Sequence, residues 1–318
     1  MSRQAINAVR AYLNDQVLGQ PELVDGLMTA LLADGHILVE GPPGLAKTRA
    51  IKMLANCIEG RFHRIQFTPD LLPADLTGTD IYRPQDGSFV FQPGPLFHHL
   101  LLADEINRAP AKVQSALLEA MAEHQITIGR KSYQLPDLFL VMATQNPIEQ
   151  EGTYPLPEAQ LDRFMLHLQL NYPDATTELA ILRLNYAECS QQAEPTPPRL
   201  TQEQLFATRQ EVLRVKLAPA IENYIVTLVM ATRRPLGFDA DLARWLSYGA
   251  SPRATMAMAR CARVRAWLQG RDFVTPDDVQ ACAYPILRHR LILSMEAEAD
   301  GIDANKVIAR LLQRVVVA

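Results

Sequence analysis

The residues best placed to do chemistry form one short loop. It reads Gly41-Pro42-Pro43-Gly44-Leu45-Ala46-Lys47-Thr48, with an apolar run before it and a helical pattern after it. In such a loop, backbone N–H groups point at phosphate oxygens, a lysine bridges the β- and γ-phosphates, and a hydroxyl ligates Mg²⁺. We therefore predict that these eight residues bind a nucleotide, with Lys47 on its phosphates and Thr48 on the metal ion.

The loop departs from the common phosphate-loop pattern at one position, since Ala46 stands where a glycine usually precedes the lysine. An alanine adds one methyl group and tolerates a helical φ angle, so we expect the loop to form. Gly41 and Gly44 are expected to allow positive φ and a close backbone approach. The alternative is a Gly/Pro turn that precedes Lys-Thr by chance.

Two carboxylates follow a second apolar run. Leu100 to Ala103 reads as a strand buried on both faces of a parallel sheet, and Asp104 and Glu105 come directly after it. Ligands of α/β proteins bind at the carboxyl ends of such strands. We predict that Asp104 holds Mg²⁺, directly or through water, and that Glu105 is the general base that polarises an attacking water. An apolar run that ends in two acids is weak evidence by itself, and the loop upstream strengthens it.

Four further residues are candidates, each with a plainer alternative. Asn146 follows the apolar run Leu138 to Ala143 and is predicted to hold the attacking water or a γ-phosphate oxygen. Arg163 could reach a neighbouring subunit's nucleotide or form a core ion pair. Arg253, in the first turn of a predicted helix, could touch the γ-phosphate or be a solvated charge. Gln20, in a turn before the loop, could pack on the adenine or belong to an ordinary helix–helix turn.

The predicted elements give an α/β core followed by a helical region. Helices are expected from Ser2 to Asp15, Pro21 to Ala33, Thr48 to Ala55 and Ala111 to Glu123, and strands at Ile37–Val39, Arg64–Phe67, 100–105 and 138–143. Asp80–Tyr82 with Ser88–Phe91, and Gln125–Ile128 with Lys131–Gln134, read as two hairpins. The first hairpin carries Phe and Tyr, which makes it a candidate contact surface or a plain surface elaboration.

The pattern changes near Tyr172. A proline-rich connector follows a helix at Asp174–Asn185, and the chain is expected to be all-helical from Thr201 onward. Ser251 and Thr275 are predicted N-caps. The predicted helices are about 201–215, 219–233, 240–248, 252–269, 276–283 and 305–316. We expect a nucleotide-binding core over 1–172, a connector over 173–200 and a helical lid domain over 201–318.

The composition is that of an ordinary globular chain. The 318 residues are 48% hydrophobic and 21% charged, with a formal net charge of −4. A net negative charge disfavours a dedicated duplex-DNA binder. The four cysteines are scattered and are expected to be reduced thiols. No signal sequence or membrane span is apparent, which predicts a cytoplasmic protein.

The full set of motifs resembles the AAA+ ATPases, and within them the MoxR family. The resemblance spans about Val17 to Arg290. The motifs are, in order, a Walker A at 41–48 that shares the alanine, a Walker B at 101–109, sensor 1 at 143–147 with Asn146, an arginine-finger segment at 158–164 with Arg163, and sensor 2 at 249–253 with Arg253. The two hairpins match the insertions of this clade. The fold implied is an AAA+ P-loop core with a parallel sheet flanked by helices, plus a C-terminal all-helical lid.

The resemblance implies a function as well as a fold. It implies an Mg-dependent ATP hydrolase that works as a ring oligomer, most commonly a hexamer, and acts as a chaperone on a client protein, often one with a von Willebrand A domain. The alternative is a nucleic-acid remodeller or metal-chelatase motor subunit, in which Arg130 and Lys131 of the second hairpin could touch phosphates. A nucleotide-gated scaffold that barely hydrolyses ATP would share every binding residue.

Overall fold

The computed structural model describes residues 2–129, 131–147, 152–189 and 195–317. The chain falls into two compact units. The first comprises residues 1–28, 36–156 and 168–205, and the second comprises residues 29–35, 157–167 and 206–318.

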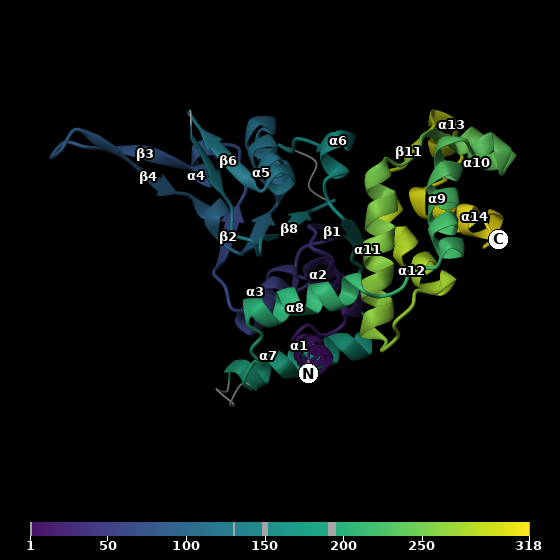
Figure 1. The fold of residues 1–318 in the computed structure, drawn as a ribbon, viewed down its shortest axis with the longest axis horizontal. Helices are drawn as coiled ribbons and strands as arrows, with labels where there is room; N and C mark the ends of the chain where they lie inside the picture. Colours follow the sequence, from purple (N-terminus) through teal and green to yellow (C-terminus); the bar gives the residue numbers. More distant parts are fainter. Residues whose placement is uncertain (1, 130, 148–151, 190–194, 318) are drawn as a thin grey trace. The chain divides into compact units, whose positions relative to one another are not determined.

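A five-stranded sheet is the centre of the first unit (Figure 1). Its order is β2 (Phe62–Gln66), β5 (Leu100–Asp104), β8 (Leu140–Gln145), β1 (Ile37–Glu40) and β9 (Leu166–Gln169). The pairings β2–β5, β5–β8 and β8–β1 are parallel. All five residues of β5 are buried, as the unbroken apolar run predicts. Among the five strands of this sheet, only β9 was not predicted from the sequence.

Helices cover both faces of this sheet. Figure 1 shows α2 (Pro21–Ala33) and α3 (Lys47–Cys57) on one face and α5 (Ala111–Glu123) on the other. α1 (Ser2–Gln16) packs against α3. The apolar side chains of α1 at Ile6, Val9, Tyr12 and Leu13 are buried, in agreement with their helical spacing. The remaining elements of this part are α4 (Pro73–Thr77), the 3₁₀ helices η1 (Pro95–Phe97) and η2 (Ile106–Arg108), and α7 (Ala175–Cys189).

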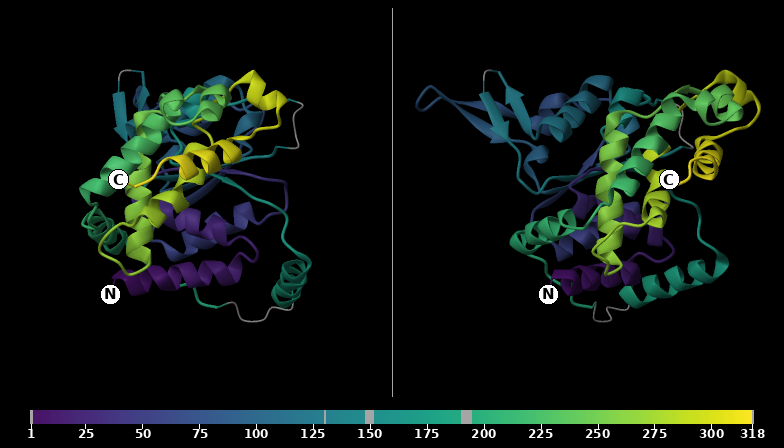
Figure 2. Two further views of the ribbon diagram at one scale, coloured as in Figure 1. Left: turned by 90° about the vertical axis from the view of Figure 1, so that its right-hand side faces the viewer. Right: turned by 45° about the vertical axis from the view of Figure 1, so that its right-hand side comes forward.

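Both predicted hairpins are present. β3 (Gly78–Arg83) pairs with β4 (Ser88–Pro93), and β6 (Gln125–Ile128) pairs with β7 (Lys131–Gln134). They extend from the same side of the first unit (Figure 2), and Phe91 of one stacks on Tyr133 of the other with ring centroids 4.1 Å apart. Tyr82 and Phe89 remain 54% and 67% exposed, with centroids 5.3 Å apart. Arg130 lies outside the described residues.

The C-terminal part is mainly helical, with one departure from the prediction. The short strands β10 (Leu246–Tyr248) and β11 (Ile292–Leu293) form an antiparallel pair, so the expectation of an all-helical region was wrong there. Chain segments between helices must still pair their backbone N–H and C=O groups, and a two-stranded ladder does this. The helices are α6 (Glu158–Leu161), α8 (Gln202–Leu213), α9 (Pro219–Arg233), η3 (Pro235–Gly237), α10 (Ala240–Trp245), α11 (Pro252–Leu268), α12 (Pro276–Leu287), α13 (Met295–Ala299) and α14 (Ala304–Arg314).

The predicted caps of two of these helices are confirmed. The Ser251 side chain accepts a hydrogen bond from the backbone N–H of Arg253 at the start of α11. Thr275 forms a capping box with Asp278 at the start of α12. α12 continues through Pro285 to Leu287, four residues past its predicted end at Ala283. Ile286 and Leu287 are fully buried, and that burial offsets the hydrogen bond that Pro285 cannot donate.

All four cysteines are free thiols, as expected. Cys57, Cys261 and Cys282 are buried, and burial raises the pKa of Cys57 and of Cys282 to about 12. These thiols are therefore protonated at neutral pH and poor nucleophiles. Within the described ranges, no helix has both the length and the apolar character that crossing a bilayer requires.

A buried histidine packs in the core of the second unit. His289 follows α12, and its Nε2 donates a hydrogen bond to the Phe164 carbonyl oxygen over 3.0 Å. Burial, and then the neighbouring positive charge of Arg290, lower the pKa of His289 well below its ordinary 6.5. The folded chain thus holds this imidazole neutral, while the unfolded chain binds a proton near its ordinary pKa.

We therefore expect His289 to make the folded state less stable in mild acid. As the pH falls below about 6.5, only the unfolded chain takes up this proton, which costs up to about 1.4 kcal/mol of unfolding free energy per pH unit. His289→Gln keeps a neutral N–H donor and should weaken this pH dependence, as measured by urea unfolding between pH 7 and pH 5. The exposed His124→Gln variant is the control. Equal pH slopes for wild type and His289→Gln would contradict the assignment.

Candidate functional site

The predicted loop, the two carboxylates and Asn146 follow three neighbouring strands of the sheet. The loop follows β1, Asp104 ends β5, and Asn146 follows β8, which lies between the other two. Because these strands are parallel, their carboxyl ends meet at one edge of the sheet. The backbone N–H of Gly41 donates to the Gln145 carbonyl over 3.3 Å, which ties the loop to the end of β8. Asn146 is 7% exposed at this edge.

The loop conformation corrects two details of the prediction. Gly44 has a φ of +86°, as expected, but Gly41 is not in the left-handed region. Gly41 serves close approach instead, because a Cβ there would lie 3.0 Å from both the Cβ and the carbonyl oxygen of Leu170. Ala46 is left-handed, with φ 55° and ψ 20°, so the expectation of an ordinary helical φ was wrong. A left-handed alanine costs about 1–2 kcal/mol because its Cβ crowds the carbonyl.

The helix start places the lysine and the threonine together. α3 begins at Lys47, so its first N–H groups and the positive end of its dipole lie at the loop. The Lys47 ammonium donates to the Gly41 carbonyl oxygen over 2.6 Å, which holds its charge over the same loop. Pro42, Pro43 and Thr48 belong to this segment as well, and Leu45 is buried under it. An anion at the loop would therefore meet backbone N–H groups and one ammonium.

Asp104 is held from two sides. Its Oδ1 accepts a hydrogen bond from the Thr144 hydroxyl over 2.6 Å. Its Oδ2 accepts two from Arg64, at 2.7 Å from Nη2 and 3.1 Å from Nε. The side chain is only 12% exposed, so the guanidinium and the hydroxyl compensate for a nearly buried charge.

Glu105 sits in a strained and crowded position. Its φ and ψ are 56° and 51°, and its backbone N–H donates to the same Thr144 hydroxyl over 2.9 Å. One carboxylate oxygen, Oε2, accepts from Gln66 Nε2 over 2.8 Å and from Arg108 Nε over 3.0 Å. Strained non-glycine backbone gathers at active sites, where the surrounding structure enforces it. The carboxylate of Glu105 is therefore aimed by its neighbours rather than left to solvent.

Four polar partners in this network were not among the predicted site residues: Arg64, Gln66, Thr144 and Arg108. Arg64 and Gln66 do lie in the strand predicted at Arg64–Phe67, and Gln66 is the last residue of the observed β2. The parallel register then pairs Gln66 with Asp104. Register between strands distant in the chain cannot be obtained from local sequence, so the contact could not be foreseen.

The predicted metal ligands have suitable chemistry. Thr48 supplies a hydroxyl and Asp104 a carboxylate, and hard oxygen donors are what Mg²⁺ takes in sites completed by substrate phosphates. Across the described part of the chain, no group of three or more His, Cys, Asp or Glu side chains could hold a metal by itself. The residues present fit an ion that is brought with a nucleotide rather than one held in a protein cage.

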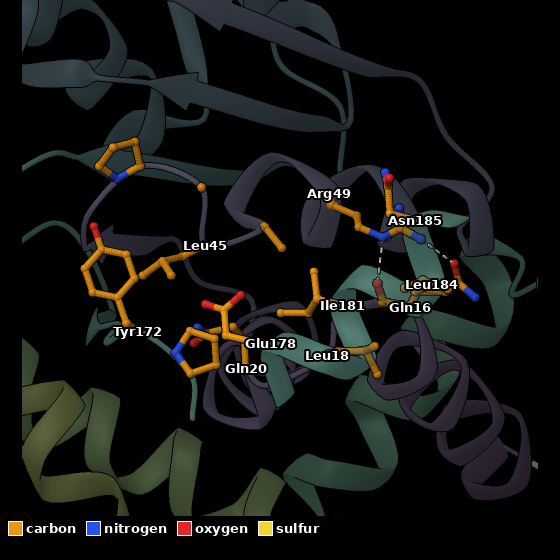
Figure 3. A pocket seen from close by; sticks show the side chains of 14 residues that line it. Gln16, Leu18, Gln20, Leu45, Arg49, Tyr172, Glu178, Ile181, Leu184 and Asn185 are labelled. Atoms are coloured by element: carbon orange, nitrogen blue, oxygen red, sulfur yellow. Dashed lines mark hydrogen bonds between the residues drawn. The ribbon is translucent and has the colours of Figure 1, made fainter. Parts of the chain in front are cut away.

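A pocket of about 370 Å³ adjoins the loop. One wall is formed by residues 43–46, and another by α7 with Tyr172 and Pro173 (Figure 3). Gln20 lines it and is 6% exposed, with its amide donating to the Asn171 carbonyl over 3.1 Å. The other lining residues are Gln16, Leu18, Arg49, Glu178, Ile181, Leu184 and Asn185. An apolar pocket with a few polar groups is typical of a site for a base or ring.

The α7 side of this pocket was not foreseen. Figure 3 shows Glu178 and Ile181 projecting from α7 toward Gln20 and Leu45. Arg49 is fixed at the far end by hydrogen bonds of 2.6 and 2.8 Å to the backbone and side chain of Gln16. The mixed composition of α7 gave no signal, because its exposed face and its pocket face carry similar residues.

The two predicted arginines lie in the second unit, where Asp162 links their surroundings. Arg253 donates from Nη1 to Asp162 Oδ2 over 3.3 Å. The Ser251 hydroxyl donates to the same carboxylate over 2.8 Å. Arg163 follows Asp162 directly and is partly exposed.

The left-handed alanine gives a direct test of the loop geometry. Ala46→Gly should raise the unfolding free energy by about 0.5–1 kcal/mol, because glycine removes the Cβ strain but adds some unfolded-state entropy. Ala55→Gly, in the right-handed interior of the same helix, should lower it by a similar amount. Denaturant unfolding of both variants measures this contrast. A loss of stability in both would show that Ala46 is unstrained.

Comparison with known proteins identifies the family. Residues 36–166 match the ATPase family associated with various cellular activities (AAA), and residues 242–311 match the AAA lid domain. The chain is 46% identical over 309 residues to Chaperone MoxR1 of Mycobacterium tuberculosis, covering 94% of this chain and 78% of that protein. It is 42% identical over 306 residues to the uncharacterized protein YeaC of Bacillus subtilis, covering 96% and 92%.

A solved structure extends the similarity to the whole fold. A crystal structure from Cytophaga hutchinsonii superposes with a TM-score of 0.92 at 44% identity, covering all of this chain and 96% of that one. The predicted fold class is therefore confirmed: an α/β AAA+ core with a helical lid domain. On this fold, this loop and these relatives, the chain belongs to the MoxR family of AAA+ ATPases.

Proposed function

We propose that this protein binds and hydrolyses ATP at the edge of the sheet formed by β1, β5 and β8. The observation that supports this most is the convergence of a phosphate loop, two carboxylates and an amide on three adjacent parallel strands. Lys47 and the loop N–H groups take the phosphates, and Asn146 orients the water or a γ-phosphate oxygen. This arrangement needs no covalent intermediate, because positioning and charge stabilisation supply the catalysis.

The two carboxylates divide the work. Thr48 and Asp104 are proposed to hold Mg²⁺, which neutralises charge on the phosphates when it is bound. Glu105 is the base that takes a proton from the attacking water. Its contacts with Gln66 and Arg108 fix the direction of its carboxylate, and its left-handed backbone sets where the side chain leaves the strand.

Replacing this base should separate hydrolysis from binding. Glu105→Gln keeps the size and a hydrogen-bonding group but cannot accept the proton, so ATP turnover should fall by about 10²–10⁴-fold. Nucleotide affinity should stay near that of wild type, whereas Lys47→Ala should lose it. Steady-state phosphate release and titration with a fluorescent nucleotide measure the two effects. Turnover at the wild-type rate in Glu105→Gln would reject the assignment.

The pocket beside the loop is proposed to hold the adenosine part of ATP. Its volume and apolar lining suit a purine, and the loop supplies the adjoining phosphates. Gln20 and the α7 residues Glu178 and Ile181 are the side chains nearest to such a base.

A charged residue on the α7 wall should weaken binding. Ile181→Glu places a charge on the pocket wall against the base and should raise the nucleotide dissociation constant about tenfold or more. Leu182→Glu is the matched control, because Leu182 is the next residue on the same helix, is 48% exposed and does not line the pocket. The control should stay within about twofold of wild type. Equal effects in both variants would place the base elsewhere.

The motor is proposed to work as a ring, most commonly a hexamer, on a client protein. Arg163 would complete the neighbouring subunit's site as an arginine finger, and Arg253 would respond to the nucleotide's terminal phosphate. The relative named a chaperone supports a protein client. The exposed aromatic pair Tyr82 and Phe89 on the β3–β4 hairpin offers an apolar surface to it. The proposed client is a protein that carries a von Willebrand A domain. The Glu105→Gln variant should retain ATP and is therefore suited to isolating that client by affinity purification.

A further inference from the structure

Arg163 lies in a segment whose backbone is held by one buried guanidinium. Arg290 donates from Nη2 to the carbonyl oxygens of Asp162 and Phe164, over 3.1 and 2.6 Å. Its Nη1 donates to the Met165 carbonyl over 3.3 Å, and its Nε donates to Asp162 Oδ1 over 2.8 Å. The residues on both sides of Arg163 are therefore bound to the same side chain.

Arg290 also connects this segment to the C-terminal end of helix α12. Arg290 also donates to the Ile286 carbonyl in the last turn of α12 over 2.5 Å. His289, the preceding residue, donates to the Phe164 carbonyl over 3.0 Å, so this oxygen accepts two hydrogen bonds. The side chain of Arg290 is 2% exposed and Phe164 is fully buried. A fork of fixed N–H donors in a dry environment allows one geometry, which a flexible ammonium could not impose.

Asp162 supplies the charge that makes this burial tolerable. Its carboxylate is 15% exposed and pairs with Arg290, and it also accepts hydrogen bonds from the Ser251 hydroxyl and, over 3.3 Å, from Arg253 Nη1. Removing one partner of a buried pair leaves the other charge without compensation. Asp162 and Arg290 therefore depend on each other to keep the backbone of residues 162–165 in place.

We propose that Asp162 and Arg290 are positioning residues for Arg163, and that they act on ATP hydrolysis in the neighbouring subunit rather than in their own. This inference rests on the proposed function, in which Arg163 is an arginine finger. A long arginine side chain reaches a defined point only if its backbone is fixed. A displacement of about 1 Å at a charge-stabilising group can cost about 10²-fold in rate.

The test uses mixed oligomers. If Asp162→Asn impairs hydrolysis in the neighbouring subunit's site, an adjacent subunit with an intact Arg163 segment should restore that hydrolysis. Lys47→Ala removes the subunit's own nucleotide site but keeps residues 162–165 intact. Asp162→Asn alone should lower turnover about tenfold or more, with nucleotide affinity and KM unchanged. Equimolar mixing with Lys47→Ala should restore activity to about a quarter of wild type, since half of the Asp162→Asn sites then adjoin an intact finger in a closed ring.

Two controls make the outcome specific. Asp278→Asn alters another buried carboxylate of the same unit, 1% exposed and paired with Arg271 at 2.7 Å, but not attached to residues 162–165. It should lose a comparable amount of thermal stability and keep wild-type turnover. If Asp162→Asn does not fold, Arg290→Lys takes its place, because it keeps the charge but not the fork, and it should show the same restoration.

The results separate this inference from the proposed function. The Arg163→Ala and Lys47→Ala mixture should also regain activity, and failure there would reject the arginine finger and with it the positioning role. If that mixture regains activity but the Asp162→Asn mixture does not, the finger stands and the positioning role in the neighbouring site is wrong. Wild-type turnover in both Asp162→Asn and Arg290→Lys would likewise overturn it.

Discussion

The parallel register of the central sheet is the constraint on which the candidate site depends. Strands β5, β8 and β1 are neighbours and run in the same direction, so whatever follows each of them emerges at one edge. The loop, Glu105 and Asn146 are separated by many residues in the chain, and only this register brings them together. All residues of β5 and all but the last residue of β8 and of β1 are buried, which fixes the positions of these strands and of the edge that they form.

This arrangement requires a strained backbone at two residues and a nearly buried charge at a third. Ala46 and Glu105 both adopt left-handed conformations, which residues other than glycine adopt only at a cost. Such strain persists only where the surroundings over-determine the chain, and here the sheet on one side and a helix start on the other do so. The Asp104 carboxylate is nearly buried and is tolerated because Arg64 and Thr144 satisfy it. The backbone strain and the buried carboxylate would each lower the stability of the folded chain, and the hydrogen bonds around them compensate for that loss.

The sequence predicted those features that are written in contiguous residues. The loop, the run ending in Asp104 and Glu105, both hairpins and the caps at Ser251 and Thr275 all lie within a few positions, and local physics decides them. The sequence did not predict contacts between distant segments. The pairing of Gln66 with Asp104, for example, follows from the register between β2 and β5. The short strands β9, β10 and β11 gain their partners only from the folded chain. Ala46 was misjudged because a residue's φ is set here by the loop around it.

Arg163, the proposed arginine finger, illustrates a second way of fixing a side chain in place. Glu105 and Asn146 are short side chains at strand ends, so the sheet positions them directly. Arg163 is long and flexible and follows the single-turn helix α6, which provides little rigidity of its own. Its neighbours are held instead by contacts between residues more than 120 positions apart. Ordering an arginine side chain costs conformational entropy, because several rotatable bonds become fixed. If the backbone is already fixed, less conformational entropy remains to be lost when the side chain binds. The buried Asp162–Arg290 pair contributes that order before any ligand or neighbour arrives.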